Sequence, residues 1–132
     1  MKAVIRQVKS LSMSCDRVGN LLLAKFSNHG AADVCIFIPA EIVFWLLRHL
    51  PVNQDPQLQA PPPPPPIQQR DWDSPTPRAL LVNCKELPGI LRMTFQLDRK
   101  PDLTVVLDRS NVELMRQIMA AYSNDLIDLD AA

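Results

Sequence analysis

The sequence predicts an α+β fold built from two βββα units, each an antiparallel meander with one helix, packed with pseudo-two-fold symmetry. Three observations support this fold class. Leu21–Leu50 has the pattern of strand, turn, strand and helix. The same plan returns in Leu91–Met119, after a shift of 69 residues that takes Leu22 to Leu91. A proline-rich connector lies between the two copies.

The predicted boundaries divide the chain into four parts. Residues 1–50 form the first unit, residues 51–78 the connector, residues 79–123 the second unit, and residues 124–132 a short acidic tail. Each unit alone is close to the size at which a single hydrophobic core gives only marginal stability. We therefore expect the two units to share one core in one compact domain, or the protein to form oligomers.

The strands of the first unit are predicted from hydrophobic periodicity. Ala3–Val8 is apolar at Val4 and Val8, and Ser10–Asp16 alternates between apolar and polar residues, which is typical of half-buried strands. Asp33–Ile38 is apolar almost throughout. A run of this kind and length favours a strand covered on both faces.

The first unit ends in a helix that begins at Pro39-Ala40-Glu41 and stops before Pro51, because proline and an acid suit the first turn and proline cannot continue a helix. This helix is apolar nearly all round, whereas a surface helix should have a polar face. One stripe can contact its own sheet: Ile42, Val43, Leu46 and Leu50. The remaining side chains need the other half of the chain or a partner, and they form the predicted interaction surface: Phe44, Trp45, Leu47 and His49.

The connector Val52–Arg78 contains six consecutive prolines, Pro61–Pro66. Proline fixes φ and lacks the amide donor, so this run favours polyproline II. We interpret it as a semi-rigid spacer. The alternative is a ligand for an aromatic groove of the SH3 or WW kind.

The second unit follows the plan of the first. Leu80–Glu86 matches Leu11–Arg17, Ile90–Leu97 alternates with period two, and Asp102–Leu107 is the apolar third strand. The shift of 69 residues pairs Leu11 with Leu80, Cys15 with Cys84, Phe26 with Phe95 and Val43 with Val112.

The second helix has two possible N-caps, Asp108 and Ser110, and Ser110 with Glu113 has the spacing of a capping box. Unlike the first helix it keeps a polar side, with Glu113, Arg116 and Gln117.

Charge argues against a dedicated nucleic-acid-binding protein, which usually carries a net basic surface. The 14 basic and 14 acidic residues balance. Residues 1–50 carry six Lys and Arg against three acids, and residues 79–132 carry six against eight. The asymmetry arises by chance or reflects complementarity, within the chain or between copies.

No pattern for catalysis or metal binding is present in the sequence. The three cysteines, Cys15, Cys35 and Cys84, have no CxxC spacing, and the two histidines have no second histidine at helical spacing. There is no GxSxG motif and no glycine-rich phosphate loop. We therefore expect a protein that is not an enzyme and that needs no metal or cofactor. The odd cysteine count, with no apparent signal peptide or membrane span, favours the cytoplasm.

The function predicted from these patterns is non-catalytic: a small soluble protein-interaction, regulatory or assembly module, expected to form homo-oligomers or to bind a protein partner. The alternative is a nucleic-acid-binding accessory protein that uses a small basic patch, Arg92, Arg99, Lys100 and Arg109. A small enzyme is a third and weaker hypothesis.

Overall fold

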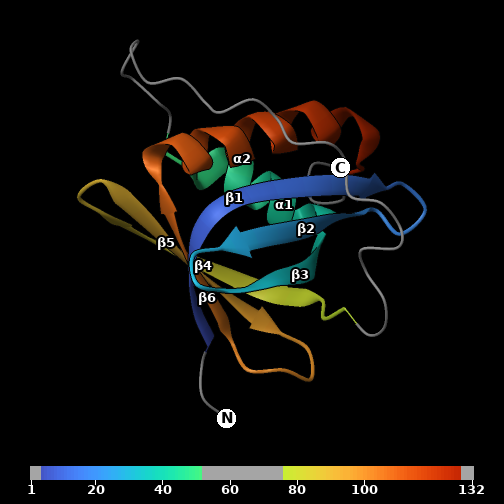
Figure 1. The fold of residues 1–132 in the computed structure, drawn as a ribbon. Helices are drawn as coiled ribbons and strands as arrows, with labels where there is room; N and C mark the ends of the chain where they lie inside the picture. Colours follow the sequence, from blue (N-terminus) through green and yellow to red (C-terminus); the bar gives the residue numbers. More distant parts are fainter. Residues whose placement is uncertain (1–3, 52–75, 129–132) are drawn as a thin grey trace.

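The computed structural model describes residues 4–51 and 76–128 of the chain. The order of elements is three strands and a helix, followed by three strands and a helix (Figure 1). Their bounds are β1 (Val4–Asp16), β2 (Leu21–Asn28), β3 (Ala31–Pro39), α1 (Ala40–His49), β4 (Ala79–Leu87), β5 (Ile90–Leu97), β6 (Leu103–Asp108), α2 (Arg109–Tyr122) and the short 3₁₀ turn η2 (Ser123–Asp125).

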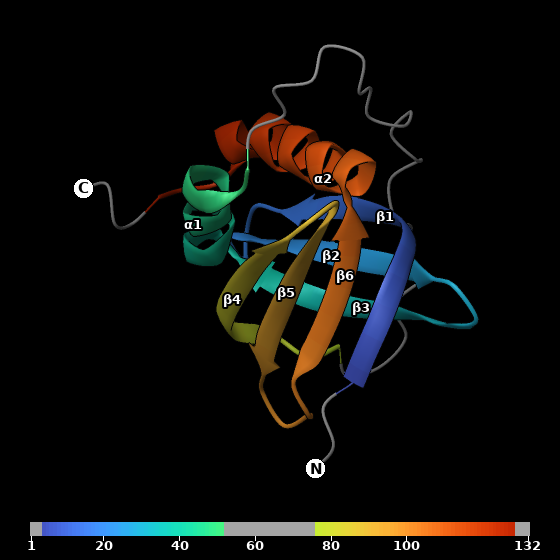
Figure 2. The ribbon, with the colours of Figure 1, turned by 90° about the vertical axis from the view of Figure 1, so that its left-hand side faces the viewer.

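The six strands form one mixed sheet in the order β3-β2-β1-β6-β5-β4. Neighbouring strands are antiparallel except β1 and β6, which run parallel. β1 joins the two three-stranded halves, because Val4–Gln7 pairs with β6 and the strand pairs with β2 from Val8 onward. A bulge between Val8 and Ser10 lies just after the change of partner, and bulges bend a strand. The sheet therefore curls, so that β4, β5 and β6 lie across from β2 and β3 (Figure 2).

The two edges of the curled sheet meet at one point in the described part of the chain. The backbone N–H of Phe37 in β3 donates to the carbonyl of Pro77 at 2.9 Å, and Phe37 forms a parallel bridge with Arg78. β3 and β4 have no further ladder contacts among the described residues. Both helices lie at one end of the curled sheet, with α2 across the end of β6 (Figure 2).

The core lies between the two halves of the sheet and beneath the helices. Phe26 of β2 and Phe95 of β5 are fully buried, and their ring centroids are 6.3 Å apart. Because each ring comes from a different half of the chain, the two halves share one core. The other fully buried large side chains come from every strand except β4 and from both helices: Leu11, Leu22, Ile36, Ile38, Leu46, Met93, Leu103, Leu107, Met115 and Met119.

The pairing of β2 with β3 recurs in the pairing of β5 with β6. Each β5–β6 pair equals a β2–β3 pair with both residue numbers raised by 69, from Leu21↔Pro39 through Phe26↔Val34. The bulge of β1 also has a counterpart, because β4 has a register shift between Ala79 and Leu81. The two hairpins are therefore built on the same register.

The first strand of each half follows a different shift. Residues 17–20 connect β1 to β2, whereas only residues 88 and 89 connect β4 to β5. The position in β4 that matches β1 is therefore raised by 71, so Cys15 corresponds to Glu86 and not to Cys84. The predicted pairing of Leu11 with Leu80 is displaced by the same two residues, and Val82 occupies the matching position.

Three local predictions differ from the structure. Ala3–Val8 and Ser10–Asp16 belong to one strand, because a bulge bends the chain there without ending the ladder. The consecutive buried residues lie in β2, at 21–24, whereas β3 buries mainly Ile36, Ile38 and Pro39. Asp108 and not Ser110 caps α2: its Oδ1 accepts from the N–H of Asn111 at 2.8 Å.

The structure confirms the α+β class, with a six-stranded mixed sheet and two helices. Most of the predicted proline-rich connector, residues 52–75, lies outside the described residues. The four-part division of the chain stays a prediction.

Replacing Phe26 with alanine should lower the free energy of unfolding by about 3–5 kcal/mol, because the change leaves a cavity against Phe95 in the shared core. Denaturant titration of both variants measures the effect. Ile5→Ala is the control, since Ile5 is 55% exposed and its loss should cost less than about 0.5 kcal/mol. Equal costs for the two variants would contradict a core shared at this contact.

Candidate interaction surfaces

Helix α1 places its predicted apolar stripe in the core, as the sequence pattern indicated. Ile42, Val43, Leu46 and the capping residue Leu50 are all buried. Pro39 is the N-cap, and the N–H of Leu50 donates to the carbonyl of Leu46 at 2.7 Å, which ends the helix before Pro51.

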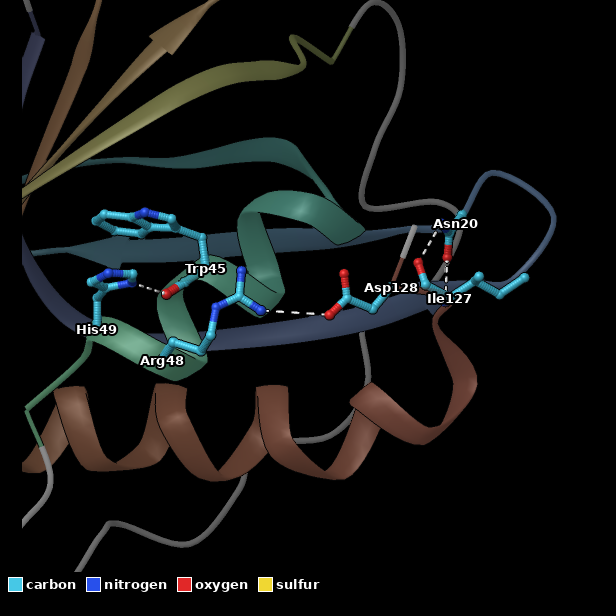
Figure 3. Close-up of polar contacts among 6 residues, drawn as sticks. All are labelled: Asn20, Trp45, Arg48, His49, Ile127 and Asp128. Atoms are coloured by element: carbon cyan, nitrogen blue, oxygen red, sulfur yellow. Dashed lines mark hydrogen bonds and ion pairs between the residues drawn. The ribbon is translucent and has the colours of Figure 1, made fainter. Parts of the chain in front are cut away.

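The predicted interaction surface occupies the outer side of α1. Phe44, Trp45 and Leu47 are half-buried and pack against the margin of the core, and His49 is exposed. The rings of Trp45 and His49 stack with centroids 4.1 Å apart and planes 17° apart (Figure 3). Nδ1 of His49 lies 2.7 Å from the carbonyl oxygen of Trp45, and since a carbonyl only accepts, Nδ1 carries the hydrogen. The stack holds both rings in fixed positions on the surface.

A charged pair of residues flanks this surface. Glu41, Trp45 and Arg48 follow one another at i, i+4 and i+7, so they share one side of α1. Glu41 and Arg48 are exposed. The outer side of α1 therefore carries an acid, an aromatic ring and a base in line along the helix.

The end of the chain is tied to the first half by polar contacts (Figure 3). The side-chain amide of Asn20 donates to the carbonyl of Ile127 at 3.0 Å, and its Oδ1 accepts from the N–H of Ile127 at 2.8 Å. Arg17 pairs with Asp125 at 2.8 Å, and Arg48 with Asp128 at 3.5 Å. These ion pairs join a basic residue of the first half to an acid near the C-terminus, so complementarity within the chain explains part of the charge asymmetry.

The structure does not bring the four residues of the predicted basic patch together. Arg92 and Arg109 lie near the end of β5 that pairs with the end of β6, at Ile90↔Asp108. Arg99 and Lys100 occupy the turn at the opposite end of the same hairpin. Nucleic-acid binding stays a prediction, with its four charges divided between two places.

Sequence analysis missed a different basic pair. Lys85 of β4 lies directly opposite Arg92 of β5, and both are exposed. Neither has an ion pair within the described residues. Like charges at opposite positions destabilise a sheet. The pair could not be recognised from the sequence, because its cross-strand register depends on the length of the turn.

A second missed feature is the apolar edge strand β4. The sequence comparison matched β4 with buried positions of the first strand, but Leu80 is 51% and Leu81 63% exposed. The register shift between Ala79 and Leu81 turns Leu81 away from the core, while Ala79 stays buried. A one-residue slip moves a side chain to the other face of a sheet.

The remaining reactive side chains have structural environments. Cys15, Cys35 and Cys84 are free thiols, and burial raises the pKa of Cys84 to about 11. The buried carboxylate of Glu113 accepts from the guanidinium of Arg116 and from the amide of Gln117, and this pairing raises the pKa of Arg116. Among residues 4–51 and 76–128, no cluster of three or more potential metal ligands occurs, and no helix is long and apolar enough to cross a membrane.

No protein family, characterised protein or solved structure matches this chain. Its function is therefore inferred from its own residues.

Asn20→Gly should release the C-terminal segment. Asn20 has a φ of +54°, which glycine adopts without strain, so the change removes the two amide hydrogen bonds and preserves the turn. We expect faster hydrogen exchange at the amide of Ile127 and a loss of about 1 kcal/mol in stability. Val18→Ala, at a 99% exposed position of the same turn, is the control. Unchanged exchange in Asn20→Gly would show that the amide does not hold the segment.

Cys84 should react slowly with thiol reagents at pH 8, because only the thiolate is nucleophilic and its pKa is about 11. The rate is measured in a variant with Cys15→Ser and Cys35→Ser, folded and in denaturant. The folded-state pKa lies above the unfolded value, so the stability from the neutral thiol is present below pH 9 and is lost as the pH rises toward 11. The stability difference from Cys84→Ala should shrink over that interval. Equal reaction rates in the folded and unfolded chains would contradict the burial.

Proposed function

We propose that this protein is a non-catalytic interaction and assembly module, and that α1 binds a second copy of the chain. The observation that carries the proposal is the outer side of α1, where the stacked rings of Trp45 and His49 lie beside the half-buried Phe44 and Leu47. Aromatic side chains held in place are typical anchors of protein interfaces. Because they are already ordered, little conformational entropy is lost on binding.

Charge complementarity favours a second copy as the partner. In a two-fold symmetric dimer the same patch contacts itself, so it must be self-complementary. If two α1 helices pack antiparallel around Trp45, Glu41 of one copy faces Arg48 of the other, and the reverse pair forms by symmetry. The acid–aromatic–base order along α1 satisfies this requirement.

The proposal includes an internal duplication of the βββα unit. Its support is the recurrence of the β2–β3 register in β5–β6, and the recurrence of the bulge of β1 in β4. The shift of 69 residues also superimposes buried positions of the helices: Val43 on Val112, Leu46 on Met115 and Leu50 on Met119. Two related connections hold the units together, since β1 pairs parallel with β6 and the start of β4 bridges parallel to β3. This arrangement is what a pseudo-two-fold axis between the units requires.

The same comparison locates the partner surface on α1. The shift places Phe44 on Glu113 and Leu47 on Arg116. In α2 these positions form an ion pair, whereas in α1 they are apolar and half-buried. The apolar replacement is useful only if another surface covers it.

Sedimentation velocity over a range of protein concentrations tests the dimer. We expect the wild type to dimerise, Glu41→Arg to weaken the dimer by about tenfold, and Glu41→Arg with Arg48→Glu to restore most of the affinity by exchanging the two charges. Trp45→Asp should weaken the dimer more than it lowers the free energy of unfolding.

Lys100→Glu is the matched control, since this exposed charge lies in the β5–β6 turn and should leave the dimer unchanged. Thermal unfolding of each variant separates loss of folding from loss of assembly. A monodisperse wild-type monomer at high micromolar concentration would refute self-association through α1.

A further inference from the structure

We infer that the open edge of β4 binds an extended acidic segment of another protein, which adds to the sheet as a seventh strand. β4 is the last strand of the sheet and pairs with β5 on one side. On its other side, the described chain makes a single bridge, Arg78 to Phe37, before the strand begins. The backbone donors and acceptors along the outer edge of Ala79–Leu87 are therefore open to a new strand, which is how several peptide-binding domains capture extended ligands (Figure 2).

The opposite edge of the sheet, β3, is built differently. Its first residues are Ala31, Ala32 and Asp33, which are small or charged, and Asp33 lies 3.7 Å from Lys25 of β2. Charges and small residues are the usual protection of an edge strand against unwanted pairing. β4 instead presents two adjacent large apolar side chains, Leu80 at 51% and Leu81 at 63% exposure. Only the β4 edge combines open backbone groups with an apolar anchor.

The charges next to this edge indicate the chemistry of the partner. Lys85 and Arg92 face each other across β4 and β5, and the described residues supply no acid to either. A strand on the outer side of β4 would place one residue directly opposite Lys85, with Arg92 on the strand beyond. A carboxylate at that position would offset the repulsion within the basic pair.

The spacing of the two features gives a recognisable sequence in the partner. Leu81 and Lys85 are four residues apart on β4, so they project from the same face. A strand added antiparallel, the more stable orientation, would therefore carry an acid, three intervening residues and then a large apolar residue. The acid faces Lys85 and the apolar residue faces Leu81.

The probe is a nine-residue peptide of alternating Thr and Val with Glu and Leu four positions apart in that order, titrated into the full chain and followed by backbone NMR. We expect saturable shifts confined to β4 and β5, and slower hydrogen exchange at the amides of the β4 edge. Lys85→Glu should weaken binding by about tenfold, and a peptide with Lys in place of Glu should restore it. Leu81→Lys should also weaken binding, while Lys100→Glu, at the far end of the hairpin, should not.

Three results would overturn the inference. The first is the absence of saturable binding by the peptide. The second is stronger binding of a single-stranded oligonucleotide at Lys85 and Arg92, which would mean that the basic pair reads phosphate. The third is self-association abolished by Leu81→Lys, which would make a second copy the occupant of this edge. The inference does not rest on the α1 dimer, because Trp45→Asp removes the proposed dimer contact and leaves β4 unchanged.

Discussion

The double pairing of β1 is the constraint on which the rest of the structure depends. One strand pairs parallel with β6 through Val4–Gln7 and antiparallel with β2 from Val8 onward. The bulge after Val8 bends it. This bend brings Phe26 against Phe95 and allows two meanders, each too small for a stable core, to bury one core between them. The order β3-β2-β1-β6-β5-β4 follows from it, because β1 and β6 meet in the centre.

A centre of this kind leaves β3 and β4 as the two edges, and it makes their fates unequal. The bridge from Phe37 to Arg78 brings the edges together once. A longer ladder would need donors from the segment before β4, where Pro77 has no N–H to give. Closure is incomplete for that reason, and the outer side of β4 stays open. The same chemistry that limits the intramolecular ladder thus creates the edge available to a partner.

Sequence periodicity predicted the features that depend on local order. The hairpins, α1, α2 and the buried stripe of α1 follow from periods of two and 3.6 and from Pro39 and Pro51. The predicted surface of Phe44, Trp45, Leu47 and His49 follows from the same count. Features set by pairing between distant strands could not be found in this way. The β1–β6 ladder joins residues about a hundred positions apart, and the two-residue difference in turn length moved Lys85 opposite Arg92.

The differences between the two halves carry more functional information than their likeness. Burial is matched where the core requires it, at Val43 and Val112 or Leu46 and Met115. It diverges on the outer surfaces, where selection for folding is weak. There α2 has the ion pair of Glu113 with Arg116, and α1 has apolar residues. β4 exposes two leucines, whereas the matching part of β1 is covered by β2 and β6. One half has thus kept an apolar helix and the other an apolar edge, and each needs a cover that the described chain does not supply.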